Sequence, residues 1–244
     1  MTVKNLASKD QGWDELLADD EDPLSTNKVT GWSVNVPIVG TCRPTTVCSE
    51  TCYFARGPST WPAALRKQWR LLRSIEQSPT EMAIRIVRSA WRKKLDFLRW
   101  NGGGDLFPRL VECIDHATEQ SPDLQHWIVS RKPELASKIT PRPNVWMHFS
   151  VDRASWGRLE DMRRMAPPSL QWHWSYQCDK GESPPSEAKD ALVIFRDSYL
   201  LTSAMQTNDC PLNGAEDITG MCQSCRRCFS DGEYRTEKQA KLVG

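Results

Sequence analysis

The 244-residue chain lacks the features that mark several large classes of protein. No apolar run is long enough to cross a bilayer, and the first residues, Met1–Lys9, have no apolar core of the kind found in signal peptides. The net charge is only +1, so the molecule as a whole is not expected to be drawn to nucleic acid. We therefore expect a cytoplasmic protein with no membrane partner, in a compartment where thiols stay reduced.

Two common catalytic motifs are missing, and histidine is scarce. The chain has no G-x-x-x-x-G-K-[ST] phosphate loop and no G-x-S-x-G nucleophile elbow. Its four histidines are dispersed, and His148 and His173 fall within predicted strands, where core positions are expected rather than metal ligands. Cysteine is plentiful, with nine residues, and in a reducing compartment so many thiols favour metal binding over disulfides.

Strand and helix patterns alternate through the middle of the chain and predict one α/β body. Strands are expected at residues 33–38, 97–100, 126–130, 145–151, 171–177 and 191–195, with helices from residue 62 and at 80–94, 107–118, 134–139 and 156–165. Such alternation predicts a parallel sheet with right-handed crossovers. Six units are too few for a closed eightfold barrel, so we expect a partial (β/α)6 TIM-like barrel with active groups at the carboxyl ends of its strands.

This barrel is expected to span residues 31–200, between two segments of different composition. Residues 1–30 form an acidic N-terminal arm: seven acids and no base between residues 10 and 22 indicate a solvated arm or a loosely docked helix. Residues 201–244 form a cysteine-rich, metal-binding C-terminal extension. Between Arg66 and Lys94 there are nine bases and two acids. Such a surface could track a phosphate backbone, although solvated helix faces explain it more simply, and the acidic arm could shield it.

Three cysteines, Cys42, Cys48 and Cys52, lie in one loop after the first predicted strand. Three thiolates can bind three irons of a [4Fe–4S] cube and leave the fourth iron open. Zinc is the alternative, but it favours four ligands in close pairs, which fits a lone triad with wide gaps poorly. A fourth protein ligand would close the cube, and Cys178, at the end of a predicted strand, is the candidate.

Two features together resemble the radical S-adenosylmethionine (SAM) superfamily, in particular radical-SAM-like proteins of actinobacteriophages. They are the cysteine loop with Tyr53 directly after it, and a glycine-rich run with an acidic end after the second strand, made of Gly102, Gly103, Gly104 and Asp105. The resemblance covers roughly residues 33 to 195. It implies that the glycine-rich run binds the methionyl amino group of SAM, whose cleavage would start radical chemistry on an unknown substrate. It also implies an electron donor such as ferredoxin or flavodoxin, and a place in the host cytoplasm if a phage encodes the chain.

Polar residues follow two further predicted strands at the edge where a barrel keeps its active groups. Ser130 ends one strand, and Ser150 and Asp152 lie at the end of the next. These side chains are candidate contacts for the cofactor or substrate. Capping of the following helix or turn explains them equally well.

A second cysteine set lies in the C-terminal extension and comprises Cys210, Cys222, Cys225 and Cys228. Its close spacing is typical of a metal site, and similar tails in radical SAM enzymes hold an auxiliary [4Fe–4S] cluster. Four cysteines also suit structural zinc, so both metals stay open here.

Three functions are consistent with these patterns. The first is an iron–sulfur enzyme of radical SAM type, with one or two [4Fe–4S] clusters. The second is a [4Fe–4S] protein without SAM, acting in electron transfer or as a structural phage protein that binds a host component. The third is a zinc-binding module associated with nucleic acid.

Overall fold

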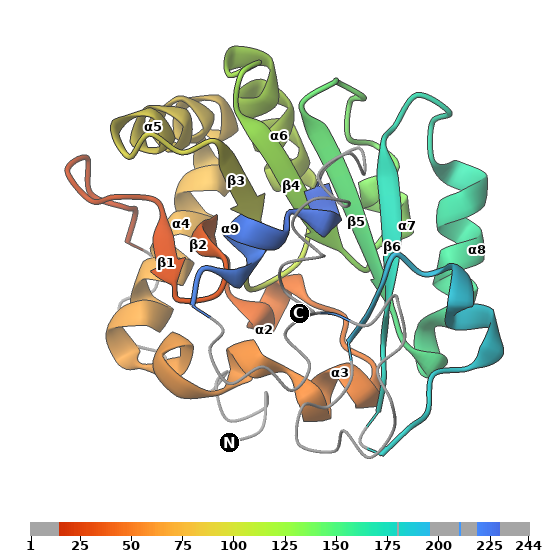
Figure 1. Cartoon of the computed structure of the whole chain (residues 1–244). Coiled ribbons are helices and arrows are strands. Elements are labelled where there is room, and N and C mark those ends of the chain that lie inside the picture. The colour runs from red at the N-terminus through yellow and green to blue at the C-terminus, as the bar shows by residue number, and fades with distance from the viewer. Residues whose placement is uncertain (1–14, 180, 196–209, 211–218, 230–244) are drawn as a thin grey trace.

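The computed structural model describes residues 15–179, 181–195, 210 and 219–229, and a mostly parallel sheet forms its centre (Figure 1). The strands pair in chain order: β1 (Ser25–Asn27), β2 (Gly31–Val34), β3 (Phe97–Trp100), β4 (Gln125–Ser130), β5 (Val145–Val151), β6 (Trp172–Gln177) and β7 (Val193–Phe195). β1 runs antiparallel to β2, and every later pair is parallel. The expected α/β class with a largely parallel sheet is therefore confirmed.

Helices connect the parallel strands. Four of them are long, α4 (Pro62–Gln77), α5 (Pro79–Arg92), α6 (Pro108–Gln120) and α8 (Trp156–Met165), and α7 (Pro133–Ala136) is a single turn. Helices α4 to α7 each begin with a proline, whose fixed backbone angle suits the first helical position and whose missing N–H is not needed there. Because the parallel strands follow one another in chain order, right-handed crossovers bring these helices to the same face of the sheet.

Short elements carry the cysteines and the strand ends. These are helices α2 (Ile38–Thr41), which packs against α4 through Ile38 and Leu65, α3 (Thr46–Thr51) and α9 (Met221–Cys225) (Figure 1). Single 3-10 turns lie at Tyr53–Ala55, Gly57–Thr60, Arg153–Ser155, Ser186–Asp190 and Arg227–Phe229. The first cysteine segment thus lies at the carboxyl ends of the strands, and the C-terminal one lies on the face of the sheet that the connecting helices leave open.

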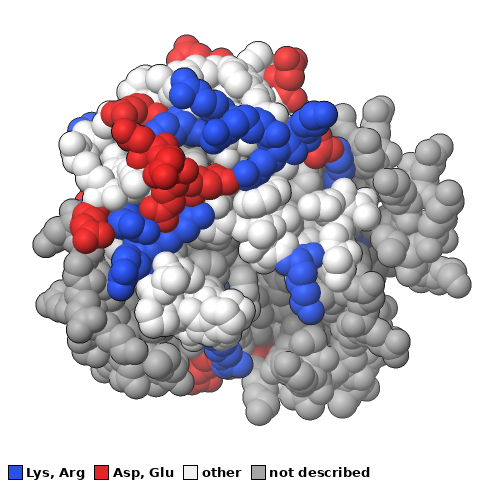
Figure 2. Space-filling model, turned by 90° about the vertical axis from the view of Figure 1, so that its left-hand side faces the viewer, with Lys and Arg blue, Asp and Glu red and all other residues white. Residues whose placement is uncertain are grey.

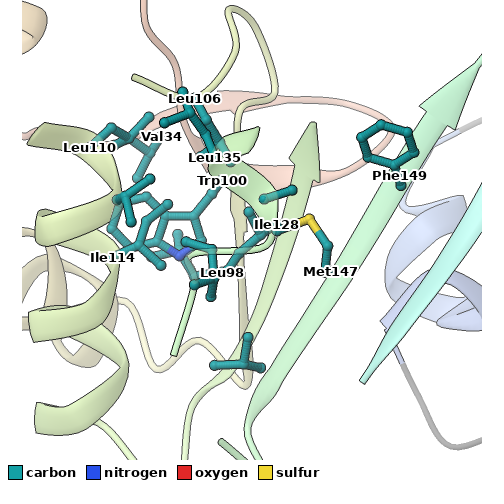
Figure 3. Close-up of a cluster of buried hydrophobic side chains, with 14 of the residues drawn as sticks. Val34, Leu98, Trp100, Leu106, Leu110, Ile114, Ile128, Leu135, Met147 and Phe149 are labelled. Atoms are coloured by element: carbon teal, nitrogen blue, oxygen red, sulfur yellow. The ribbon is translucent and has the colours of Figure 1, made fainter. Parts of the chain in front are cut away.

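The hydrophobic core fills the space between the sheet and the long helices (Figure 3). Because alternate residues of a strand point to opposite faces, one set of side chains enters this core. That set includes Val34, Leu98, Trp100, Ile128, Met147 and Phe149, which pack with Leu110 and Ile114 of α6. The opposite face, which we call the second face, carries the aromatic side chains of Phe97, Trp127 and Trp146.

The predicted elements match the structure closely in the middle of the chain. The strands at 97–100 and 145–151 and the helix at 156–165 have the predicted bounds. The first parallel strand ends at Val34, four residues earlier than predicted. Its continuation leaves the sheet because the Asn35 side chain accepts a bond from the Gly103 N–H (3.0 Å), and Pro37 has no N–H to donate to a ladder. The short antiparallel β1 was not predicted.

For the part of the acidic segment that the structure describes, from residue 15 onward, the expected solvated arm is wrong, and the docked alternative is right except that the segment is not helical. Leu17 is buried, and its N–H donates to the Ser74 hydroxyl of α4 (2.9 Å). The Arg85 guanidinium of α5 donates to the carbonyl oxygens of Leu17, Ala18 and Glu21. The acidic segment therefore docks onto α4 and α5 as ordered coil.

Charge pairing explains this docking. Glu21 forms an ion pair with Arg70 (2.9 Å), and Asp22 forms one with Lys93. Figure 2, which views this side of the molecule, shows acidic groups interleaved with basic ones. The acidic segment therefore shields part of the basic helix faces, at Arg70, Arg85 and Lys93, whereas Arg66, Arg88 and Arg92 stay exposed.

Candidate metal centres

The three cysteines of the first loop form one group of thiols, which we call the first cysteine site. Cys42 directly follows α2, Cys48 lies in α3, and Cys52 directly follows α3. Burial raises the pKa of the Cys42 thiol far above its usual value, and the nearby Asp105, Cys48 and Cys52 raise it further. Burial also raises the pKa of the Cys48 thiol, which the Arg131 guanidinium partly offsets. The charges of all three thiols therefore act on one another at the carboxyl edge of the parallel strands.

The glycine-rich run holds this loop against the sheet. A Cβ atom on Gly103 would lie 2.1 Å from the Phe54 ring, so only glycine allows that ring to pack there. The Tyr53 hydroxyl donates to the carbonyl oxygen of Gly102. The two residues that follow Cys52 thus contact two successive glycines, and the loop is anchored directly at the end of β3.

The end of the glycine-rich run is tightly constrained. Gly104 has a φ of +83°, and a Cβ atom there would lie 2.6 Å from the carbonyl oxygen of Val36. Asp105 is buried, and its carboxylate accepts bonds from the Ser130 hydroxyl (2.7 Å) and the Leu106 N–H (2.7 Å). Burial raises the pKa of Asp105, although these bonds oppose the change. The carboxylate is therefore occupied by the protein's own donors, and its contact with a SAM amino group stays a prediction.

A second network joins the cysteine helix to β4 and β5. Thr45 caps α3 by accepting a bond from the Cys48 N–H (3.1 Å), and its hydroxyl donates to Asp152. The Arg131 guanidinium donates to the same carboxylate and also to the Ser150 hydroxyl (3.3 Å). Burial raises the pKa of Asp152, but the Thr45 and Arg131 bonds outweigh it, so this pKa lies below its usual value. A charged Asp152 thus fixes the position of Cys48 through Thr45.

Ser130, Ser150 and Asp152 therefore lie close to the first cysteine site, as expected for groups at the carboxyl ends of adjacent strands. Of the two explanations offered for them, capping is seen at Asp152, and contact with a cofactor or substrate stays a prediction. Asp152 also forms a capping box with Ser155 at the 3-10 turn before α8. The same carboxylate caps that turn and anchors the cysteine loop.

The four C-terminal cysteines also form one group, which we call the second cysteine site. Burial raises the pKa of the Cys228 thiol well above its usual value, and the thiols of Cys210, Cys222 and Cys225 raise it further. The Cys210 N–H donates to the carbonyl oxygen of Ile194 in β7 (2.9 Å). This bond holds Cys210 at the edge strand β7, within reach of the other three cysteines, which lie more than ten positions later in the sequence.

Aromatic stacking docks the second cysteine site on the second face of the sheet. The Phe229 ring stacks on Phe97 with a centroid distance of 4.4 Å and on Trp127 with a distance of 5.1 Å. Cys222 and Cys228 pack against the same aromatic cluster. The Cys222 N–H also donates to the carbonyl oxygen of Val29 beside β2 (3.2 Å). The cysteine-rich segment is therefore part of the folded body.

All nine cysteines are free thiols, as metal ligation requires. Among the described residues, no three Cys, His, Asp or Glu side chains converge to hold one metal ion. Iron–sulfur clusters at these two cysteine sites, and zinc at the second, therefore stay predictions.

Two further candidates are buried, Cys178 in the hydrophobic core and His148 on the second face of the sheet. Cys178 is completely buried and packs in the core together with Tyr176, the arrangement expected of an apolar cysteine. Its role as a fourth ligand stays a prediction. His148 lies on β5 at 2% exposure beside Trp127, and among the described residues neither ring nitrogen has a hydrogen-bond partner. Burial lowers the pKa of His148 to about 3, so its ring is neutral.

Two residues that build these sites were not singled out from the sequence: Thr45, which anchors the first cysteine site, and Arg99 of β3, which lies between the two sites. Arg131, which directly follows Ser130, was part of the same polar strand-end signal, and it anchors the first cysteine site through Asp152. Thr45 fits the residue preference of a helix N-cap, although the short α3 has no apolar periodicity that would reveal it.

A family model described as gene product 88 matches residues 6–231, a range that includes both cysteine sites. The chain belongs to the gene product 88 family. This is a phage-type family, in agreement with the phage resemblance of the sequence. No curated protein and no solved structure matches this family member. Within its described residues, no helix is both long enough and apolar enough to span a membrane.

Proposed function

We propose that this member of the gene product 88 family is an iron–sulfur protein built on a partial (β/α)6 TIM-like barrel. Cys42, Cys48 and Cys52 would hold a [4Fe–4S] cluster, and the second cysteine site would hold another metal centre. The grouping of three loop thiols at the carboxyl edge of parallel strands is the observation that carries this proposal. The sequential strand order and the one-sided helices support the partial barrel.

The surrounding residues have defined tasks in this proposal. Phe54 and Tyr53 seat the loop on the glycine-rich run, and Thr45 with Asp152 fixes the backbone at Cys48. The Arg131 guanidinium, whose charge lowers the pKa of the Cys48 thiol, favours the thiolate that binds iron. When bound, a cube with one open iron supplies the one-electron chemistry of radical SAM enzymes.

SAM cleavage is the more specific form of the proposal, and the alternative is a [4Fe–4S] protein without SAM. The alternative is favoured by Asp105, because its carboxylate already accepts bonds from Ser130 and Leu106 and is 5% exposed. The triad itself favours SAM, because it leaves one iron of a cube without a cysteine. The third candidate, a zinc module that binds nucleic acid, loses some support because the acidic segment pairs with Arg70 and Lys93, two of the basic residues on this side.

Anaerobic purification followed by EPR of the reduced protein tests the two leading forms. We expect a brown protein with a [4Fe–4S] signal that Cys48→Ala abolishes and that Cys113→Ala, a change of a core cysteine, preserves. A signal that changes when SAM is added supports the radical SAM form. A signal that ignores SAM supports the alternative, and a protein without iron or sulfide rejects both.

A further inference from the structure

Arg99 of β3 lies between the two cysteine sites and contacts the surroundings of both. On one side, its guanidinium donates to the Tyr53 hydroxyl (3.2 Å), and Tyr53 directly follows Cys52. On the other side, the guanidinium carbon lies 4.6 Å from the centroid of the Trp127 ring, on which Phe229 of the C-terminal segment also stacks. One side chain therefore spans the distance between the two loops.

Arg99 also places a positive charge beside the second cysteine site. Its guanidinium lies over the Trp127 ring, and Cys222 and Cys228 pack against the aromatic cluster to which that ring belongs.

Unused donors lie beside the same site. The Nε atom of Arg99 and the indole Nε1 of Trp127 are both buried, and within the described part of the chain neither has a hydrogen-bond partner. A buried N–H without an acceptor is costly, so an uncompensated pair of this kind is unusual. Trp127 belongs to the aromatic cluster against which Cys222 and Cys228 pack, and Arg99 lies over its ring. An anionic, sulfur-rich group at the second cysteine site would supply the missing acceptors.

We propose that Arg99 is the shared charge of the two cysteine sites: it stabilises the reduced state of a [4Fe–4S] centre on the second site and links it, through Tyr53, to the first. This inference rests on the proposed function, because it requires an iron–sulfur centre at both sites. A cation next to a cluster favours the state with one more electron, since that state carries one more negative charge. Loss of the Arg99 charge therefore lowers both reduction potentials, and the second falls further than the first.

Redox titration followed by EPR tests this on the anaerobically purified full chain. The signals of the two centres are assigned with Cys48→Ala and Cys222→Ala. In Arg99→Gln, we expect the reduction equilibrium of the second centre to fall about tenfold, which is about 59 mV for one electron. We expect the reduction equilibrium of the first centre to fall by about threefold. Arg88→Gln, which removes an exposed charge from α5, is the matched control and leaves both centres unchanged.

Two further variants separate charge from position. Arg99→Lys keeps the cation, and the second centre should stay within about threefold of the unchanged protein. Tyr53→Phe removes only the hydroxyl that accepts a bond from Arg99. The reduction potential of the first centre should therefore shift, and that of the second centre should stay the same. If Arg99→Gln prevents loading of the second centre, Arg99→Lys must restore it. Failure of both to load would mean that Arg99 is needed for packing, and it overturns the proposal.

The remaining outcomes distinguish failure of the inference from failure of the proposed function. If the reduction potentials in Arg99→Gln match those in Arg88→Gln, Arg99 is not the shared charge and the inference is overturned. The proposed function still stands in that case if iron and sulfide are present at both sites. Zinc in place of iron at the second site overturns the inference but leaves the first centre standing. A chain with neither iron nor sulfide rejects the proposed function and the inference together.

Discussion

The two cysteine sites contain the same ligand type but are attached to the sheet by different interactions. The first is held by polar bonds at the strand ends, in which Thr45, Asp152 and Arg131 tie the loop to β4 and β5. The second is held on the open face by stacking of Phe229 on Phe97 and Trp127. Polar anchoring fixes directions, whereas stacking of aromatic rings mainly removes apolar surface from water. We therefore expect the first site to be the more sensitive to small changes of geometry.

The largest effect is predicted for Gly104→Ala, which acts on the first site alone. The new Cβ would lie 2.6 Å from a backbone carbonyl oxygen at a φ of +83°. Overpacking and the positive φ together should lower the free energy of unfolding by about 4 kcal/mol. Urea denaturation and iron analysis measure the outcome, and we expect loss of the first centre.

Gly157→Ala is the control for this change. Gly157 lies in α8, and no atom lies within 4 Å of its would-be Cβ, so alanine should leave stability unchanged or raise it by up to about 1 kcal/mol. Equal stability of Gly104→Ala and Gly157→Ala would contradict the tight seating of the glycine-rich run.

Phe229→Ala should release the second site and leave the first in place. Loss of a buried aromatic ring that stacks on two others should cost about 3 kcal/mol. We expect metal analysis to show loss of the C-terminal centre with the first centre retained. Phe229→Leu keeps apolar volume and should retain most of the metal; loss of both centres in either variant would show that the two sites are not independent.

Acid should weaken the fold through the second face of the sheet. The pKa of His148 is lowered to about 3 in the folded state, against about 6.5 in an unfolded chain. Above pH 6.5 the ring is neutral in both states, and below it only the unfolded chain binds the proton. Between pH 6.5 and pH 5, His148 should therefore lower the free energy of unfolding by about 2 kcal/mol.

Denaturation at pH 7 and pH 5 checks this contribution. His148→Phe cannot bind the proton, so its loss of stability between the two pH values should be smaller by about 2 kcal/mol. His126 has a pKa lowered in the same way and serves as the comparison on the helix side of the sheet. An unchanged pH response in His148→Phe would show that this ring is not buried in the neutral form.

The smallest effect is predicted for Thr45→Ala, which removes the cap of α3 and its bond to Asp152. Loss of an N-cap typically costs about 1 kcal/mol. Thr45→Ser keeps the hydroxyl and should behave like the unchanged protein in thermal unfolding. We also expect slower cluster assembly in Thr45→Ala, because the Cys48 N–H loses its acceptor. Identical unfolding of the alanine and serine variants would remove Thr45 from the network.

The sequence was sufficient to predict the order of the central elements. Strand 145–151 is recognisable because its residues are nearly all apolar, as expected of a strand covered on both faces. The first strand was placed too far along, because Asn35 and Pro37 act through contacts and backbone limits that alternation does not reveal. The docked acidic segment was missed in part because its stability comes from Arg70 and Arg85, which lie far away in the sequence.

The sequence revealed the cysteine ligands of the candidate sites better than the hydrogen bonds and ring contacts that position them. Cysteine spacing revealed both groups of thiols, and strand ends revealed Ser130, Ser150 and Asp152. Arg99 could not be recognised, because its role depends on the pairing of β3 with its neighbours and on the docking of Phe229 over the same face. Likewise, the sequence could not show that Asp105 is buried under protein donors.

Iron and acid-labile sulfide per chain, counted after anaerobic purification, test the central claim most directly. We predict about eight of each in the unchanged protein. Separate replacement by alanine of the three first-loop cysteines, or of Cys222, Cys225 and Cys228, should leave about four of each, while Cys113→Ala leaves all of them. Zinc without sulfide in the unchanged protein, or full iron after loss of the first-loop cysteines, would contradict the account.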